Sequence, residues 1–362
     1  MNHLYPSRYA KLATCNMSQW ALDFSGNKER IIKSIRMAKD QGCGLRLGSE
    51  LEITGYSCED HFLEIDTVNH SWEILAEILA TDATKNIICC VGMPLIHQNL
   101  LFNCSIFLLD QKLLLIRPKQ ILSDYGNYRE GRYFTAWNKS QLEDYLLPEV
   151  IQKANGQITV PIGNAIIQTK DTEIAIEMYE ELWQMNPLSR SIELESVEIF
   201  LTNNVIHQQL NELESRIRTF TDTTFKNGGI HMYSNQIGCD GGRLYFDGSC
   251  MIVANGELLG IGSQFSLKDV EVKPCLINLD EITSKKLCLK SPSGALSSTN
   301  KIPKIRVDFK VTQDFEPKKM ELPLSTPIKD IIPTFQEEIA KGPACYMFNY
   351  LKRSEPLEKS GT

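Results

Sequence analysis

The sequence lacks the patterns by which disulfide-rich and metal-binding proteins are usually recognised. Its 11 cysteines are an odd number without CxxC spacing, and its six histidines form no HxxxH or HExxH pattern. We therefore expect neither a disulfide framework nor a zinc site. Most thiols should be small core residues of a protein in a reducing compartment. This indicates a cytoplasmic location, with no metal and no cofactor.

A surplus of positive charge and a long apolar run are also missing. Lys and Arg total 38 against 45 Asp and Glu, a formal net charge of −7, which argues against a nucleic-acid surface. The longest near-apolar stretch, residues 87–96, is too short to span a bilayer, and the first six residues contain no apolar signal core. We therefore expect neither a nucleic acid nor a membrane as a partner.

The composition is nevertheless that of a folded chain, because 42% of its 362 residues are hydrophobic. No short repeat or low-complexity segment occurs, which argues against a solenoid or a propeller. A strand is predicted over 11–16, followed by a helix that Asn27 caps. Hairpin turns are predicted at 110–111 and at 255–256. Strands separated partly by helices and partly by hairpins indicate an α+β fold with a mixed sheet.

Two polar residues follow predicted strands and are candidates for chemistry. Glu50 lies at the end of a predicted strand over 45–51, where a carboxylate can face a cleft and burial would raise its pKa towards that of a general base. Lys119 follows the predicted strand 112–117 and could hold an oxyanion or pair with a buried acid. Each residue also has a simpler interpretation, as a solvated acid or base at a strand edge.

A third candidate is the segment 174–183, in which a short apolar strand runs directly into an acidic turn. Hydrolases often present a nucleophile on such an elbow. The residue at the elbow is Tyr179, which is a poor nucleophile at neutral pH because a phenol has a pKa of about 10.

A series of motifs follows in one order along nearly the whole chain. They are 19–24, 50–52 with 55–56, 117–119, 126–130, 180–183, 226–230, 238–245 with 247–248, 262–265 and 342–345. In this order they resemble the glutaminase domain of eukaryotic glutamine-dependent NAD synthetases, a branch of the nitrilase superfamily. That resemblance implies a four-layer αββα sandwich. It also implies a tail over 1–10, the nitrilase-like domain over 11–290, an extension over 291–355 and a second tail over 356–362.

The resemblance further implies a Glu–Lys–Cys triad that hydrolyses the side-chain amide of glutamine. In that family, the ammonia then passes to a synthetase domain that makes NAD. By position, Glu50 would be the general base, Lys119 the oxyanion stabiliser and Glu130 a supporting acid. The residues implied to contact the substrate are Tyr128, Glu180 and Asn203.

The chain departs from the family at the nucleophile. The family has a cysteine directly before Glu-Glu-Leu-Trp, whereas this sequence has Tyr179. Because a thiolate is far more nucleophilic than a neutral phenol, we expect no glutaminase activity. The bulky run 204–207 replaces a small loop that holds the amino acid end of the substrate, and Ser49 replaces a proline. Core filling is the expected role of the remaining cysteines nearest the site, Cys58 and Cys250.

Three hypotheses about function stay open. The first and favoured one is a pseudoenzyme that forms homo-oligomers, or hetero-oligomers with a full-length NAD synthetase, with glutamine as a candidate ligand. The second is an active carbon-nitrogen hydrolase that cleaves another amide, through a different nucleophile or a water activated by Glu50. The third is a truncated copy without a retained role. Under all three, the chain alone is not expected to make NAD, because no Ser-Gly-Gly-x-Asp-Ser pyrophosphate loop occurs in it.

Overall fold

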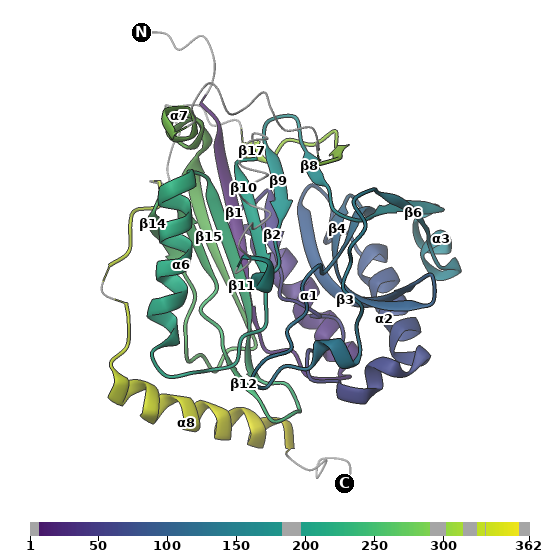
Figure 1. Ribbon diagram of the computed structural model, residues 1–362, viewed down its shortest axis with the longest axis horizontal. Helices are drawn as coiled ribbons and strands as arrows, with labels where there is room; N and C mark the ends of the chain where they lie inside the picture. The colour runs from purple at the N-terminus through teal and green to yellow at the C-terminus, as the bar shows by residue number, and fades with distance from the viewer. Residues whose placement is uncertain (1–6, 183–196, 290–301, 314–323, 330, 355–362) are drawn as a thin grey trace.

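The structure is a computed structural model that describes residues 7–182, 197–289, 302–313, 324–329 and 331–354. Two β-sheets lie face to face, and helices cover their outer faces (Figure 1). In this view α6 stands at the left and α2 at the right, with the strands between them.

The first sheet is mixed, as the sequence predicts. Its central strands β1, β2 and β3 are parallel, and β3, β4 and β5 form an antiparallel meander. The turn between β4 and β5 has positive φ at Asp110 and Gln111, as the predicted hairpin requires. The strands of this sheet are β1 (Tyr9–Met17), β2 (Leu45–Leu47), β3 (Ile88–His97), β4 (Leu100–Leu109), β5 (Lys112–Pro118), β6 (Glu143–Leu146), β7 (Thr159–Ile162), β15 (Val270–Asn278) and β17 (Thr312–Gln313).

The second sheet is built around the parallel strands β9, β10 and β11. The predicted turn at Asn255 and Gly256 joins β13 to β14. A short parallel pairing between Asn16 and Asn235 connects β1 of the first sheet to β11. The strands are β8 (Ile166–Gln168), β9 (Glu173–Ile176), β10 (Ile199–Asn203), β11 (Ile230–Cys239), β12 (Tyr245–Asp247), β13 (Met251–Ala254), β14 (Glu257–Ile261) and β16 (Lys304–Arg306).

The core lies in three apolar layers. One layer fills the space between the sheets and includes Leu47 and Phe107 from the first sheet and Ile199 and Met232 from the second. The other two layers pack helices against the outer faces. Strand β3 contributes to both sides of its sheet, so its run is continuously apolar rather than alternating. These layers confirm the four-layer αββα sandwich.

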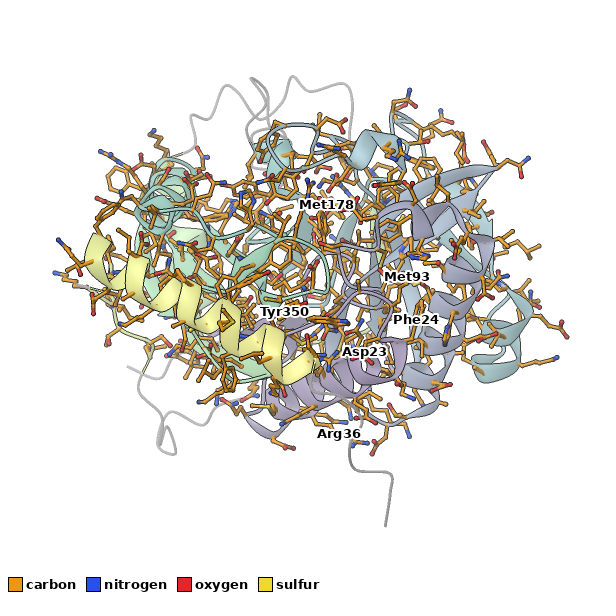
Figure 2. All side chains as sticks on the ribbon, turned by 90° about the horizontal axis from the view of Figure 1, so that it is seen from below. Asp23, Phe24, Arg36, Met93, Met178 and Tyr350 are labelled. Carbon is orange, nitrogen blue, oxygen red and sulfur yellow. The ribbon has the colours of Figure 1, made fainter. Side chains whose placement is uncertain are left out.

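Three helices, α1, α2 and α3, pack on the first sheet, and α6 packs on the second. Helix α8 crosses the lower edge of the sandwich in Figure 1. In Figure 2, Tyr350 of α8 lies near Asp23, and the neighbouring Arg353 donates to Asp23 at 3.3 Å. The helices are α1 (Phe24–Asp40), α2 (Ile65–Ala80), α3 (Glu149–Asn155), α4 (Tyr179–Leu182), α6 (Glu212–Asn227), α7 (Leu279–Leu289) and α8 (Phe335–Ser354), with 3-10 turns η1 (Glu59–Leu63) and η2 (Glu130–Arg132). None of the helices described is long and apolar enough to cross a lipid bilayer.

Two local predictions were wrong. The cap of α1 is Asp23, whose carboxylate accepts from the Gly26 amide at 3.1 Å, whereas Asn27 is buried inside the first turn. Strand β2 ends at Leu47, so Glu50 lies in the following loop rather than at the end of the strand. The tail predicted over 356–362 lies outside the described residues, as do parts of the extension predicted over 291–355.

Candidate active site

The loop that carries Glu50 is fixed from two sides. The Arg46 guanidinium pairs with the Glu52 carboxylate through bonds of 2.7 and 2.9 Å, and both side chains are fully buried. On the other side the loop lies directly on Gly92 of β3, where a Cβ atom would come within 2.3 Å of the Leu51 nitrogen. These contacts hold Glu50 in the interior with only 1% of its surface exposed.

Lys119 is the centre of a buried cluster of charges. It follows β5 and is fully buried, and its Nζ lies 2.8 Å from Glu50, 2.9 Å from Glu130 and 2.7 Å from Glu180. A lysine ammonium has three donors, so three carboxylates are enough to engage all of them. The structure therefore brings together four residues that the sequence singled out, and it places Glu180 directly on the lysine.

Three residues that were not predicted hold the carboxylates in place. Asn103 of β4 donates to Glu50 at 2.6 Å, and the Tyr56 hydroxyl donates to Glu130 at 2.6 Å. The backbone amide of Ser123 donates to Glu130 at 2.9 Å, and its hydroxyl donates to Glu180. Tyr56 belongs to one of the sequence motifs, but Asn103 and Ser123 carry no signal that connects them with Glu50 along the chain.

Burial and crowding set the protonation of this cluster. The pKa of Glu50 is raised to about 8, mainly by burial; Lys119 opposes this rise, and the neighbouring acids Glu130 and Glu180 add to it. Burial also raises the pKa of Glu130. Burial alone would lower the pKa of Lys119, but the three carboxylates outweigh it and raise that pKa well above its ordinary value. Lys119 therefore stays charged at neutral pH, and Glu50 keeps its proton to a higher pH than an exposed glutamate does.

The elbow before Tyr179 is tied to the strand that carries Lys119. Arg117 of β5 forms a two-pronged pair with Glu181, with bonds of 2.6 and 2.5 Å. The same carboxylate accepts from the backbone amides of Met178 at 3.1 Å and Gln120 at 2.8 Å. Figure 2 shows Met178 toward the middle of the molecule. The buried Arg117–Glu181 pair thus fixes the position of helix α4 relative to the lysine.

Tyr179 begins α4 with its side chain 4% exposed. It belongs to an apolar cluster with Ile206 and Leu213, and its ring lies 6.3 Å from that of Tyr233. Burial raises the pKa of its hydroxyl above the ordinary value, and nearby glutamates raise it further against the opposing effect of Arg216. A phenolate nucleophile is therefore even less accessible at neutral pH than in water.

The two other implied substrate contacts have different surroundings. The Tyr128 hydroxyl accepts from the His207 backbone amide at 3.0 Å and donates to the Val205 carbonyl at 3.2 Å, which ties its loop to the segment 204–207. Asn203, at the end of β10, donates to Ser105 of β4 at 2.7 Å. Within the described residues, no hydrogen bond or ion pair joins Asn203 to the Lys119 cluster.

A groove of about 470 Å³ opens beside α4. Its lining is mostly aromatic and aliphatic, with two carboxylates and one amide, and consists of Ile121, Leu122, Tyr125, Tyr128, Tyr179, Glu180, Ile206, Gln209 and Glu212. No basic side chain belongs to this set. Glu180 therefore has both the groove and the Lys119 cluster within reach of its carboxylate.

The two cysteines nearest the site by the sequence analysis, Cys58 and Cys250, are buried and poorly suited to act as nucleophiles. Burial raises the pKa of Cys58 to about 12, and Cys250 is fully buried with its pKa raised in the same way. In the part of the chain that the structure describes, no three His, Cys, Asp or Glu residues are arranged to hold a metal ion.

The chain is similar in sequence to a known family and to curated proteins. Residues 11–278 match the family model of carbon-nitrogen hydrolases. The chain belongs to the carbon-nitrogen hydrolase family. The chain is 45% identical over 348 residues to the glutamine-dependent NAD(+) synthetase of Arabidopsis thaliana, and 44% identical over 349 residues to that of Homo sapiens. Each match covers 96% of this chain but only 48% and 49% of the two synthetases, so the chain spans about half their length.

Solved structures show the same fold. A glutamine-dependent NAD(+) synthetase from Cytophaga hutchinsonii aligns with a TM-score of 0.66 and 23% identity, over 74% of this chain and 43% of that protein. An amidase of the nitrilase superfamily from Nesterenkonia aligns with a TM-score of 0.58 and 17% identity, over 80% of this chain and 97% of the amidase. The resemblance inferred from the motifs is therefore confirmed, as is the fold that it implied for this carbon-nitrogen hydrolase.

Proposed function

We propose that this member of the carbon-nitrogen hydrolase family does not hydrolyse glutamine and serves as a non-catalytic subunit. The observation that carries the proposal is Tyr179 at the nucleophile elbow, with its ring buried beside Leu213 and Tyr233. The covalent route needs a nucleophile that attacks the amide carbon, and a buried neutral phenol is a poor one. Losing such a nucleophile typically lowers turnover by several orders of magnitude.

The surroundings of Lys119 support the same conclusion. A tetrahedral oxyanion is stabilised by donors that already point at its position. Here the Lys119 ammonium is engaged by Glu50, Glu130 and Glu180, with Glu180 nearest at 2.7 Å. An oxyanion could bind the lysine only after one of these carboxylates had moved away.

The similarity to NAD synthetases suggests a partner. At 44–45% identity, about half of each synthetase corresponds to this chain. Oligomers are commonly built from equivalent surfaces of like subunits, so a chain this similar could take the place of the matching region in an assembly. We infer that the partner is a full-length synthetase, with homo-oligomers as the simpler form. The division at 11–290 and 291–355 and the cytoplasmic location stay predictions.

The partner proposal can be tested by mixing the tagged chain with a full-length synthetase. We expect the two proteins to co-elute in size-exclusion chromatography after affinity capture, and the rate of glutamine-dependent NAD formation to change with the amount of chain added. Separate elution, with no self-association of the chain alone, would contradict the proposal.

Glutamine itself is a candidate ligand, and calorimetric titration of the pure chain measures whether it binds.

One observation favours the alternative of an active hydrolase. Burial raises the pKa of Glu50 to about 8, which would suit a general base that activates water in mildly alkaline solution. Release of ammonia from simple amides that rises towards pH 9 and disappears in Glu50→Gln would establish this alternative. Against it stand the 1% exposure of Glu50 and the full engagement of Lys119.

A further inference from the structure

The groove beside α4 has the chemical character of a site for a positively charged organic ligand. Its volume of about 470 Å³ lies within the range of small-molecule pockets. Tyrosine rings and aliphatic side chains form most of its wall, and among the described residues that line it the charged ones are Glu180 and Glu212.

The two carboxylates differ in what they already bind. Glu180 is paired with Lys119 at 2.7 Å, so much of its charge is compensated. Glu212 is partly exposed in the first turn of α6, and no described residue forms an ion pair or hydrogen bond with its carboxylate. Glu212 can therefore give a ligand cation a partner without first breaking a contact.

Among the described residues, the two cations next to the lining of the groove, Lys119 and Arg216, cannot compensate an anionic ligand there. Lys119 is fully engaged by its three carboxylates. Arg216 is completely buried, is held by Asp247 at 3.1 Å and lies 5.7 Å from the centre of the Tyr233 ring. It does not line the groove. A carboxylate placed there would face glutamates, and none of the described lining residues would give it a basic partner.

The aromatic wall adds attraction for a cation. Tyr125 is 53% exposed, and its ring meets that of Tyr128 edge to face at 5.5 Å, while Tyr179 lines the same groove. Tyrosine faces attract organic ammonium ions, and several rings together with a carboxylate form the usual cage for such a group. The negative charge around the groove also affects the Tyr125 hydroxyl. Burial raises its pKa to about 12, and Glu180 contributes to this rise.

We propose that this groove binds a small organic ammonium ion that carries an apolar group and no carboxylate. The ammonium would lie between Glu212 and the tyrosine rings, and the apolar group would contact Ile206 and Leu122. This goes beyond the proposed function, because it concerns what the groove binds, whether or not any amide is cleaved.

The test is calorimetric titration at low ionic strength with three probes of similar size. Phenethylammonium carries the cation alone, L-phenylalanine adds a carboxylate to it, and phenylacetate carries only the anion. We expect saturable binding of phenethylammonium, binding of L-phenylalanine weaker by about tenfold or more, and no binding of phenylacetate. No saturable binding of phenethylammonium, or equal affinity for L-phenylalanine, would overturn the proposal.

Matched variants locate the ligand. Glu212→Gln should weaken phenethylammonium binding by about three- to tenfold, whereas Glu214→Gln, an exposed acid in the same helical turn, should leave it unchanged. Tyr125→Ala should weaken binding by about fivefold, and Tyr125→Phe, which keeps the ring, should restore most of it. Equal effects of Glu212→Gln and Glu214→Gln would refute the assignment. Ammonia release by the chain is measured separately, so failure here is distinguishable from failure of the proposed function.

Discussion

Lys119 is the residue that balances the buried charges of the site. Without its ammonium, Glu50, Glu130 and Glu180 would face one another in the interior with no cation between them. Removing one partner of a buried ion pair typically costs about 3–5 kcal/mol. We expect Lys119→Met to lower the free energy of unfolding by that amount in urea titrations at pH 7. Lys153→Met is the matched control, because that lysine is 74% exposed, and a similar loss in both variants would contradict the account.

The raised pKa of Glu50 makes a prediction about pH. Its ordinary pKa is 4.5 and its folded value is about 8, so between these values the folded chain binds a proton that the unfolded chain has released. Stability should therefore fall as pH rises through this window, by up to about 1.4 kcal/mol per pH unit for one proton. In Glu50→Gln this contribution disappears, so the variant should gain relative to wild type between pH 5 and pH 8. Parallel stability profiles of the two proteins in denaturant titrations would contradict the assignment.

The residues of the site could be predicted only in part from the sequence. Glu50 and Lys119 were recognisable because each lies at or just after a predicted strand. Each also belongs to one of the sequence motifs, 50–52 with 55–56 for Glu50 and 117–119 for Lys119. Asn103 and Ser123 were not, because their roles depend on contacts across the fold with Glu50 and Glu180. The direct contact of Glu180 with Lys119 also depends on the rotation of α4, which the buried Arg117–Glu181 pair sets.

At the scale of elements, the close contact between β3 and the Glu50 loop controls the site. A Cβ atom on Gly92 would lie 2.3 Å from the Leu51 nitrogen and 2.7 Å from the Ser49 oxygen, and neither backbone atom can rotate away. We expect Gly92→Ala to lower stability by about 1–3 kcal/mol through this overpacking. Gly342→Ala, inside α8, has only ordinary contacts from 3.5 Å and should be neutral or slightly stabilising. A thermal melt compares them, and an unchanged melting temperature for Gly92→Ala would contradict the contact.

Local sequence patterns were enough to predict some of the turns and element ends, but not others. The hairpin at 110–111 was predictable because its two polar residues separate two apolar runs. In the structure both residues adopt positive φ. The cap of α1 was not, because Asn27 has the side chain of a cap but is drawn inward, where its amide donates to the carbonyls of Trp20 and Ile53. Strand β2 is shorter than the strand predicted over 45–51 because the chain leaves the sheet after Leu47, and the following loop places Glu50 against Lys119.

At the scale of the whole molecule, the layer between the sheets makes the sandwich a single unit. Phe107 of β4 lies in this layer with 1% exposure, among side chains from both sheets. Truncating a buried phenylalanine typically costs about 3–5 kcal/mol. We expect Phe107→Ala to show that loss, with far-ultraviolet circular dichroism and tryptophan fluorescence shifting together. Phe225→Ala, at a site 61% exposed, should change stability little. Separate transitions for the two probes would show that the sheets unfold independently.

The arrangement of the whole fold was predicted from the order of the sequence motifs and not from the periodicity of apolar residues. Patterns of apolar residues alone predicted a mixed α+β fold, whereas the pairing of β1 with β11 joins segments more than 200 residues apart. Resemblance to the carbon-nitrogen hydrolases supplied that long-range arrangement, and the layers of the structure agree with it.

The most direct test of the account is ammonia release from L-glutamine by wild type, Tyr179→Cys, Glu50→Gln and the Tyr179→Cys/Glu50→Gln double variant. We predict that wild type is indistinguishable from Glu50→Gln. Tyr179→Cys should release ammonia at a rate that rises linearly with glutamine, because none of the described residues that line the groove is basic and could pair with the substrate carboxylate. The double variant should be silent. Ammonia release by wild type that Glu50→Gln abolishes would contradict the central claim.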